Sequence, residues 1–250
     1  NREYTAIGFA GLQLGYFLCN LTPEKMAHIE TISLIISGLM EFICLFYSIH
    51  YRIKYGNNSI AGKIYIYLLM GVTMDVLWII LDRKQSELIY HLFILLEFTF
   101  LCWLFYRKST KWLKRVIIIL FIFFPLMIVG RILGFITKEF TYIVFLYENI
   151  VITFLGLQFF TRLFTQGLNK LREGIRDFWA ISGITFSFVL PIPLYCISLY
   201  FWQYNYEYAF NFTFSNPGIN ILVNSIPQIS DTIMYWFFIK AFLCKIPANK

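Results

Sequence analysis

The chain has 250 residues, of which 59% are hydrophobic and only 14% are charged. Its mean hydropathy is +0.66, whereas ordinary soluble domains carry about 25% charged residues. A soluble domain of this length does not need so much apolar surface, but a bilayer requires segments of about 20 apolar residues. The composition therefore excludes an ordinary soluble enzyme. It predicts one membrane domain, with no room for a soluble catalytic domain.

Apolar segments of the required length recur along the whole chain and are separated by short connectors. They predict an all-α membrane protein built as a seven-transmembrane-helix bundle. The predicted spans are 29–50, 63–81, 88–106, 116–135, 141–163, 178–202 and 219–242. Prolines fall within the fourth, sixth and seventh spans, and the pair Pro191 and Pro193 predicts that the sixth span is broken.

The predicted seven-helix domain covers residues 28–244, and residues 245–250 form a short cytoplasmic tail. Residues 1–27 precede this domain. Within them, the stretch 5–19 is apolar, but it is short and contains Gly8, Gly11 and Gly15. We expect an interfacial or re-entrant segment there, with the remnant of an extra span as the alternative.

The positions of the basic residues predict the orientation of the helices. Fifteen of the 21 Lys and Arg residues lie in the connectors 51–63, 107–115 and 162–177 or at the C-terminal end. The positive-inside rule places this side in the cytoplasm, with the C-terminus, and the N-terminus outside. The net charge of +7 is then a topology signal that suits anionic lipid headgroups. No basic stretch belongs to a nucleic-acid-binding module, so the expected partner is a lipid bilayer and not a nucleic acid.

Five of the 14 acidic residues lie inside the predicted spans. A charged group near the bilayer centre is costly, so such residues usually face a bundle interior and mark a site. The five are Glu41, Asp75, Glu97, Glu148 and Asp231. They cannot all stay ionised in a low dielectric, so we expect several of them to be protonated at neutral pH through desolvation and mutual repulsion.

Four more polar residues complete the predicted site. Arg131 and Glu148 lie at matching depth in the outer thirds of neighbouring spans, which predicts an ion pair between them. His91 lies in the outer third of its own span. Asn224 and Gln228 belong to a polar stripe at helical spacing in the seventh span, and this stripe must turn away from lipid. We expect these nine residues to bind a small ligand or a proton, with hydrogen bonding between helices as the alternative explanation.

The sequence lacks the patterns that indicate an enzyme, a metal site or a cofactor. It contains no Gly-rich phosphate loop, no pair of histidines at helical spacing and no Ser/His/Asp constellation. The five cysteines lack the spacing of metal ligands. His28, His50 and His91 lie at three different depths, whereas a catalytic zinc ion needs clustered ligands. We therefore expect no catalytic residues, no metal and no cofactor.

Four stretches of the sequence resemble an uncharacterised family of seven-helix bacterial inner-membrane proteins. They are YHLFILLEF (90–98) running into LFYRK, YENIVITFLGLQFF (147–160), RDFWAISGITFSF (176–188) and VNSIPQISDTIMYWFFIKAF (223–242). The resemblance covers the seven spans and leaves out residues 1–27. Genes of this family often lie beside, or are fused to, those of sensor histidine kinases. The resemblance implies a multi-pass protein of the bacterial cytoplasmic (inner) membrane with a signalling partner such as a histidine kinase.

Together these features predict a receptor-like or sensory module whose acidic cavity opens outward and whose basic cytoplasmic face meets a signalling partner. The alternative is a proton-coupled small-molecule transporter or channel. In that case the acids predicted near the bilayer midplane, Glu41, Glu97 and Asp231, relay protons. Pro227 and the pair Pro191 and Pro193 then act as hinges. An enzyme acting on lipids has the least support, because no nucleophile–base or metal pattern accompanies the acids.

Overall fold

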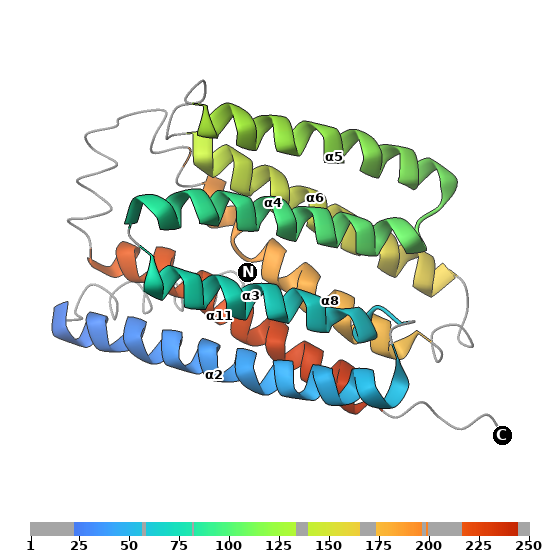
Figure 1. Cartoon of the computed structure of the whole chain (residues 1–250), viewed down its shortest axis with the longest axis horizontal. Coiled ribbons are helices and arrows are strands. Elements are labelled where there is room, and N and C mark those ends of the chain that lie inside the picture. Colours follow the sequence, from blue (N-terminus) through green and yellow to red (C-terminus); the bar gives the residue numbers. More distant parts are fainter. Residues whose placement is uncertain are drawn as a thin grey trace, which may run out of the picture.

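The structure is a computed structural model of the chain, and it describes residues 23–56, 59–81, 83–133, 140–165, 174–196, 199 and 217–244. Within these ranges the regular structure is entirely helical and contains no strand, as the sequence predicts. The helices are α2 (Pro23–Tyr55), α3 (Ile64–Ile80), α4 (Arg83–Lys108), α5 (Lys111–Ile132), α6 (Phe140–Thr165), α8 (Ile175–Val189) and α11 (Pro217–Leu243), with the short 3-10 helix η1 (Ala61–Lys63) before α3 (Figure 1).

In the part of the chain that the structure describes, five helical segments are long and apolar enough to cross a membrane. They are Thr31–Tyr55, Ile89–Lys108, Lys111–Gly130, Ile143–Thr165 and Ile175–Cys196. Large apolar side chains are exposed on their surfaces, among them Phe46 at 72% and Leu126 at 63%. Such a surface suits lipid and not water. The five segments therefore indicate a membrane protein. Two helices are not among the five, namely α3, which has 17 residues, and α11.

Each predicted span corresponds to one helix, but the ends differ by several residues. α2 and α4 continue past positions 50 and 106 to Tyr55 and Lys108. Their last turns contain basic residues, which interact favourably with the C-terminal end of a helix. α2 also begins earlier than position 29, at Pro23, so residues 23–27 are helical. The remainder of the predicted N-terminal segment and the predicted tail lie outside the described residues.

The predicted break in the sixth span is present. α8 ends at Val189, and two turn residues separate it from a helical turn at 192–196. Pro191 is the second of these turn residues, and proline has no N–H to continue the helical ladder. In contrast, Pro125 and Pro227 lie inside α5 and α11, which continue through them.

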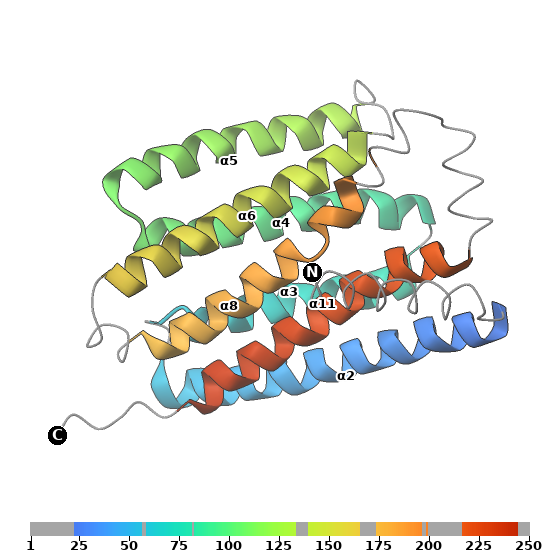
Figure 2. The ribbon, with the colours of Figure 1, turned by 180° about the vertical axis from the view of Figure 1, so that it is seen from behind.

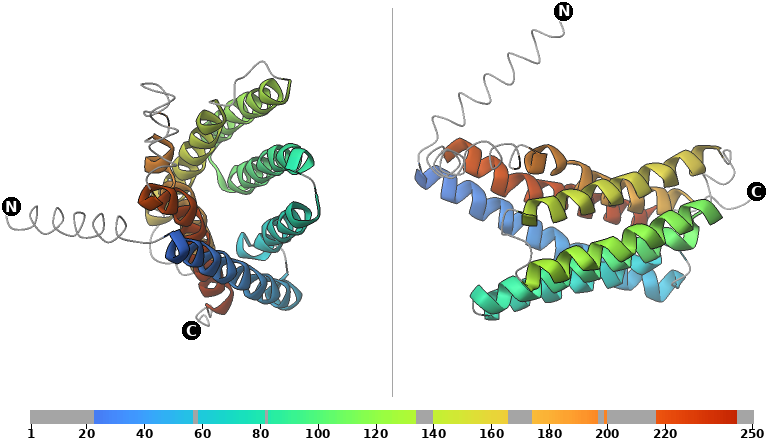
Figure 3. Two further views of the ribbon diagram at one scale, coloured as in Figure 1. Left: turned by 90° about the vertical axis from the view of Figure 1, so that its left-hand side faces the viewer. Right: turned by 90° about the horizontal axis from the view of Figure 1, so that it is seen from above.

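Six helices form a closed ring, and α5 lies outside it. Going round the ring, α2 packs against α3, α3 against α4, α4 against α6, α6 against α8, α8 against α11, and α11 against α2. α5 contacts α4 and α6. The end-on view in Figure 3 shows this arrangement, and Figure 2 shows α8 between α6 and α11. The ring encloses an interior that six helices line.

The close packing of α8 against α11 depends on a glycine. A Cβ added at Gly183 would lie 2.9 Å from the Cβ of Phe237 and 3.0 Å from the carbonyl oxygen of Met234. Small residues allow this close approach, which stabilises helix pairs in a membrane. α8 is therefore held firmly against α11 along the wall of the interior.

Candidate functional site

A cavity of about 610 Å³ lies inside the ring of helices. Its described lining residues come from all six ring helices and from the segment after α8, and none comes from α5. The cavity brings together all five acids of the predicted spans, each from a different helix: Glu41 (α2), Asp75 (α3), Glu97 (α4), Glu148 (α6) and Asp231 (α11). Its volume falls within the range of about 300–1,000 Å³ that is typical of small-molecule sites.

The cavity occupies the half of the bundle that lies away from the basic connectors. One end of the cavity is lined by Tyr90 near the start of α4, Pro227 in the first half of α11 and Tyr195 after α8. Tyr67 and Tyr235 line it deeper in the bundle. This half is the outer half in the orientation that the basic residues predict.

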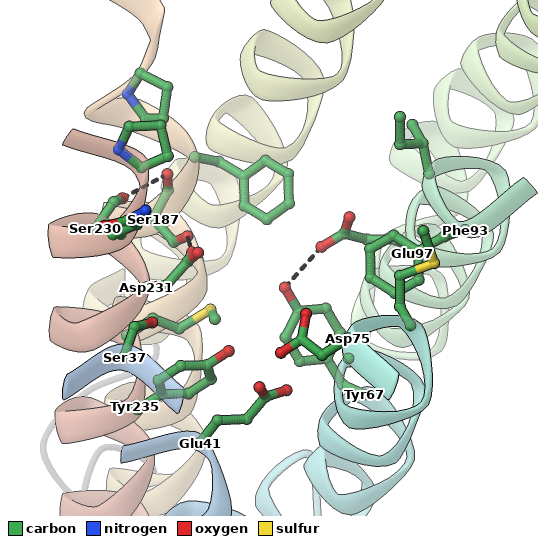
Figure 4. A pocket seen from close by; sticks show the side chains of 18 of the residues that line it. Ser37, Glu41, Tyr67, Asp75, Phe93, Glu97, Ser187, Ser230, Asp231 and Tyr235 are labelled. Carbon is green, nitrogen blue, oxygen red and sulfur yellow. Dashed lines mark hydrogen bonds between the residues drawn. The ribbon is translucent and has the colours of Figure 1, made fainter. Parts of the chain in front are cut away.

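Hydroxyl groups hold two of the acids in place. The Tyr67 hydroxyl of α3 donates a hydrogen bond to Oε1 of Glu97 at 2.7 Å. The Ser187 hydroxyl of α8 donates to Oδ1 of Asp231 at 3.1 Å. Beside it, the Ser230 hydroxyl donates to the carbonyl oxygen of Ser187 at 2.9 Å (Figure 4). Each of these acids is therefore oriented by a neighbouring helix.

Glu41 and Asp75 form another part of the wall. Figure 4 shows their carboxyl groups turned toward one another from α2 and α3. Glu41 is buried, and a Cβ added at Gly71 would overlap its Oε1. The absence of a side chain at Gly71 therefore makes room for this carboxyl group, a role that no sequence pattern indicated.

Glu148 differs from the other acids in its environment. Only 3% of its surface is exposed, and its Oε1 has no hydrogen-bond partner among the described residues. Buried polar atoms are nearly always hydrogen-bonded, so an exception calls for an explanation such as a bound ion or ligand.

The predicted site residues on α4 and α5 are His91, Glu97 and Arg131. The structure describes the side chains of the first two, so only these can be compared with the cavity. His91 is buried on α4 next to Tyr90, but it is not among the lining residues. The side chain of Arg131 lies outside the described residues, and so does the predicted ion pair between Arg131 and Glu148. Among the lining residues that the structure describes, none is a Lys, Arg or His.

The predicted polar stripe of the seventh span faces the cavity in part, because Thr232 belongs to it but bonds to the carbonyl oxygen of Gln228 within α11 and does not line the cavity. Gln228, Asp231 and Tyr235 line the cavity. Oε1 of Gln228 also accepts a hydrogen bond from the Ser33 hydroxyl of α2. The side chain of Asn224 lies outside the described part of the chain. This face of α11 therefore combines contacts between helices with a wall of the cavity.

An aromatic cluster, which the sequence analysis missed, lines the outer part of the cavity. It consists of Tyr90, Phe145 and Tyr195. Ring centroids are 5.9 Å apart for Tyr90 and Phe145, and 5.6 Å apart for Phe145 and Tyr195. Phe145 precedes Glu148 by three residues, so both lie on one face of α6. That spacing was the only signal in the sequence.

A second polar cluster lies at the opposite end of the bundle, where α8 begins. Oδ1 of Asp177 accepts hydrogen bonds from the backbone N–H groups of Ile60, at 2.8 Å, and Ala61, at 3.4 Å. Its Oδ2 lies 3.6 Å from Nζ of Lys108. Asp177 is buried, so its carboxylate ties α8 to the connector between α2 and α3 and to the end of α4.

Arg176 extends this cluster toward the ends of α2 and α11. Its Nε donates to the carbonyl oxygen of Cys244 at 2.9 Å, and its Nη1 donates to the Tyr51 hydroxyl at 3.0 Å. The guanidinium carbon lies 4.4 Å from the ring centroid of Tyr55. We call Arg176, Asp177 and these partners the basic-end clasp. In the sequence, Arg176 contributes only to the positive-inside pattern and to one of the four stretches that carry the family resemblance.

The chain was compared with known proteins, and no protein family, curated protein or solved structure matches it. Its function must therefore follow from the cavity and the clasp.

Proposed function

We propose that the protein is a receptor-like sensory module that crosses a bacterial cytoplasmic membrane seven times. In this proposal α3 and α11 span the membrane together with the five long apolar segments, and the cavity binds a small ligand or a proton without a catalytic step. The observation that carries the proposal is the convergence of five carboxyl groups from five helices on one cavity. Hydrogen bonding between pairs of helices does not require a shared cavity, whereas a site for a positively charged ligand does.

The arrangement of the connectors supports the proposed orientation. One end of the bundle lies to the right in Figure 1. It contains the last turns of α2, α4 and α11 and the first turns of α3, α5 and α8. The basic connectors 51–63 and 107–115 therefore lie together at that end. Exposed Arg107, Lys111 and Arg115 give it a positive surface. This surface suits anionic headgroups and an acidic region of a cytoplasmic partner. Such a partner is a histidine kinase if the sequence resemblance holds.

A sensor must also transmit the state of its site, and α8 offers a route. Ser187 on α8 is bonded to Asp231 at the cavity, and Arg176 and Asp177 on the same helix form the clasp at the other end. A helix moves as a rigid element, so a shift of α8 at the cavity would displace the clasp. The clasp in turn contacts both basic connectors, at Ile60 and Lys108.

The second candidate function is a proton-coupled transporter or channel. Its support is that Pro191 and Pro227 both line the cavity. Prolines in membrane helices leave carbonyl groups free and allow local adjustment of the backbone, as a gate requires. The midplane acids would then carry protons through the bundle.

The first experiment tests transmission from the cavity to the basic end. The chain is placed in lipid nanodiscs with a fluorophore on Lys111→Cys, in a background without Cys19, Cys196 and Cys244. Protons are the probe, because protonation changes the charge of the cavity whatever the natural ligand is. The sensor proposal predicts that emission changes between mildly alkaline and mildly acidic pH, and that Asp231→Asn reduces the change. An identical response in wild type and variant would contradict it.

A second experiment separates the two candidate functions. Proteoliposomes containing a trapped pH dye receive an imposed pH gradient. A sensor leaves the decay of the gradient as slow as in empty liposomes, whereas a channel or proton-leaking transporter accelerates it. If the protein accelerates the decay and Asp231→Asn abolishes this acceleration, the transporter or channel would replace the sensor as the proposed function.

A further inference from the structure

The unsatisfied Oε1 of Glu148 is the starting point for identifying the ligand. This atom belongs to a side chain that is 97% buried, lines the cavity and has no hydrogen-bond partner among the described residues. A carboxylate accepts hydrogen bonds and donates none. The missing partner is therefore a donor, and a charged donor gives the stronger bond.

The acidic lining of the cavity also favours a cation. Five carboxyl groups line it, and its described lining contains no basic side chain. Intramembrane acids are normally paired with a positive group or neutralised. A positively charged ligand would supply the missing charge at the place where the donor is missing.

The spread of the acids favours a ligand with several atoms over a metal ion. Among the residues that the structure places, no three His, Cys, Asp or Glu side chains come close enough together to hold a metal ion. Calcium, for example, needs six to eight oxygen atoms at about 2.3–2.6 Å. Acids that come from five helices around a cavity of about 610 Å³ instead leave room for an organic body.

The walls suit a body that is apolar or aromatic. The cluster of Tyr90, Phe145 and Tyr195 stands beside Glu148, and Phe93 and Phe188 also line the cavity. Aromatic faces attract cations and cover apolar groups equally well. An ammonium group at Glu148 would therefore have aromatic rings around the carbon atoms next to it.

We infer that the cavity binds a small organic ammonium ion, that is, a protonated primary amine with an apolar or aromatic body. The inference deepens the proposed function and rests on it. The ammonium group donates hydrogen bonds to Glu148 and to Glu97, which line the same cavity from the packed helices α6 and α4. The body lies against Tyr90, Phe145 and Tyr195.

The test uses the full chain in nanodiscs at neutral pH, with empty nanodiscs to correct for uptake by lipid. Three probes of one shape are titrated: 2-phenylethylamine, the neutral 2-phenylethanol and the trimethylated phenylethylammonium ion, which has no N–H donor. Calorimetry gives the dissociation constants. We expect the amine to bind at least about tenfold more tightly than either analogue, the factor that one hydrogen bond to a charged group supplies.

Variants locate the ammonium group. Glu148→Gln should weaken binding of the amine about tenfold or more and leave binding of the alcohol unchanged. Thr161→Val is the matched control on α6, because Thr161 is exposed and hydrogen-bonded only to the Leu157 carbonyl within its own helix. If Glu148→Gln does not reconstitute, the comparison of amine and alcohol on the wild-type chain decides alone.

Three results would overturn the inference. Equal affinity for the amine and the alcohol would show that the site recognises only the apolar body. Equal affinity for the amine and the trimethylated ion would show that no N–H group donates to Glu148. Binding of calcium chloride that depends on Glu148 would make it a metal site. The failure of the proposed function is a separate result: the amine would bind, but the fluorophore on Lys111→Cys would not respond. If the fluorophore responded to protons but the amine did not bind, the sensor proposal would stand and the inference of an ammonium ligand would be refuted.

Discussion

Asp177 accepts a hydrogen bond at 2.8 Å from the backbone N–H of Ile60, a residue 117 positions earlier in the chain. Ile60 directly precedes η1 and Ala61 is the first residue of η1, and the first N–H groups of a helix have no partner within it. Asp177 therefore acts as a capping side chain that another helix supplies. Both backbone groups are buried, so water cannot replace the carboxylate. The connector between α2 and α3 thus depends on α8 for its conformation.

Asp177→Ala should lower the free energy of unfolding by about 1–3 kcal/mol or more, because the N–H groups of Ile60 and Ala61 then lack an acceptor. Asp177→Asn keeps an acceptor oxygen and should lose less. Reversible unfolding in mixed micelles measures both. Lys108→Met is the control, since the Lys108 side chain is 46% exposed and such an ion pair contributes at most about 1 kcal/mol. A loss in Lys108→Met as large as in Asp177→Ala would assign the stability to the ion pair instead.

Arg176 and Tyr51 should be energetically coupled. Arg176 donates through Nη1 to the Tyr51 hydroxyl and through Nε to Cys244, and lysine does not offer two such donors at fixed spacing. Arg176→Lys should therefore destabilise the chain, and Tyr51→Phe should cost less in the Arg176→Lys background than in wild type. Residues in contact give interaction energies of about 0.5–3 kcal/mol in such a cycle. Additive losses would show that the two side chains do not interact in the membrane.

The fold was largely predictable because hydrophobicity is a property of local sequence. Each of the seven predicted spans overlaps a described helix, and the break near Pro191 follows from the chemistry of proline. Helix ends were less predictable, because Pro23 and the basic last turns of α2 and α4 extend the helices beyond their apolar cores. Whether all seven helices cross the membrane, and in which direction, stays a prediction.

The acids of the cavity were predictable for a similar reason, since a carboxylate stands out in an apolar segment. Their partners were not. Tyr67 and Ser187 look like ordinary residues of a membrane helix until folding places them beside Glu97 and Asp231. Asp177 escaped notice because its partners are backbone groups far away in the chain, which no local pattern reveals.

The packing of α8 against α11 gives a prediction about Gly183. A Cβ there would lie 2.9 Å from the Cβ of Phe237, closer than side chains tolerate, so Gly183→Ala should destabilise the chain by about 1–3 kcal/mol. Gly38→Ala is the matched control, because nothing lies within 4 Å of a Cβ at that position. There the better helix propensity of alanine should make the change neutral or stabilising. Mixed-micelle unfolding of both variants decides, and equal effects would contradict the close packing.

The orientation can be tested by reporter fusions. Fusions after Ser109 and Gly167 should report a cytoplasmic position, and fusions after Gln85 and Asn205 an external one. The reason is that basic connectors stay on the cytoplasmic side. An external reading at Ser109 would overturn the seven-span arrangement, because the connector 107–115 contains five basic residues.

The contact between Glu41 and Gly71 offers the most direct test of the cavity wall. Gly71→Ala should destabilise the wild-type chain by about 0.5–1.5 kcal/mol, because the new methyl group would overlap Oε1 of Glu41 and this flexible side chain would have to leave its preferred conformation. In a Glu41→Ala background the oxygen is gone. Gly71→Ala should then be neutral or stabilise by up to about 1 kcal/mol, the difference in helix propensity between the two residues.

Gly38→Ala serves as the control for this cycle, since Gly38 lines the same cavity and a Cβ added there would meet nothing within 4 Å. It should have the same effect in both backgrounds, measured by unfolding in mixed micelles. A cost of Gly71→Ala that persists without the Glu41 carboxyl group would mean that this carboxyl does not lie against α3. Glu41 would then be absent from the wall that the structure gives it, and the acidic cavity would lose one of its five members.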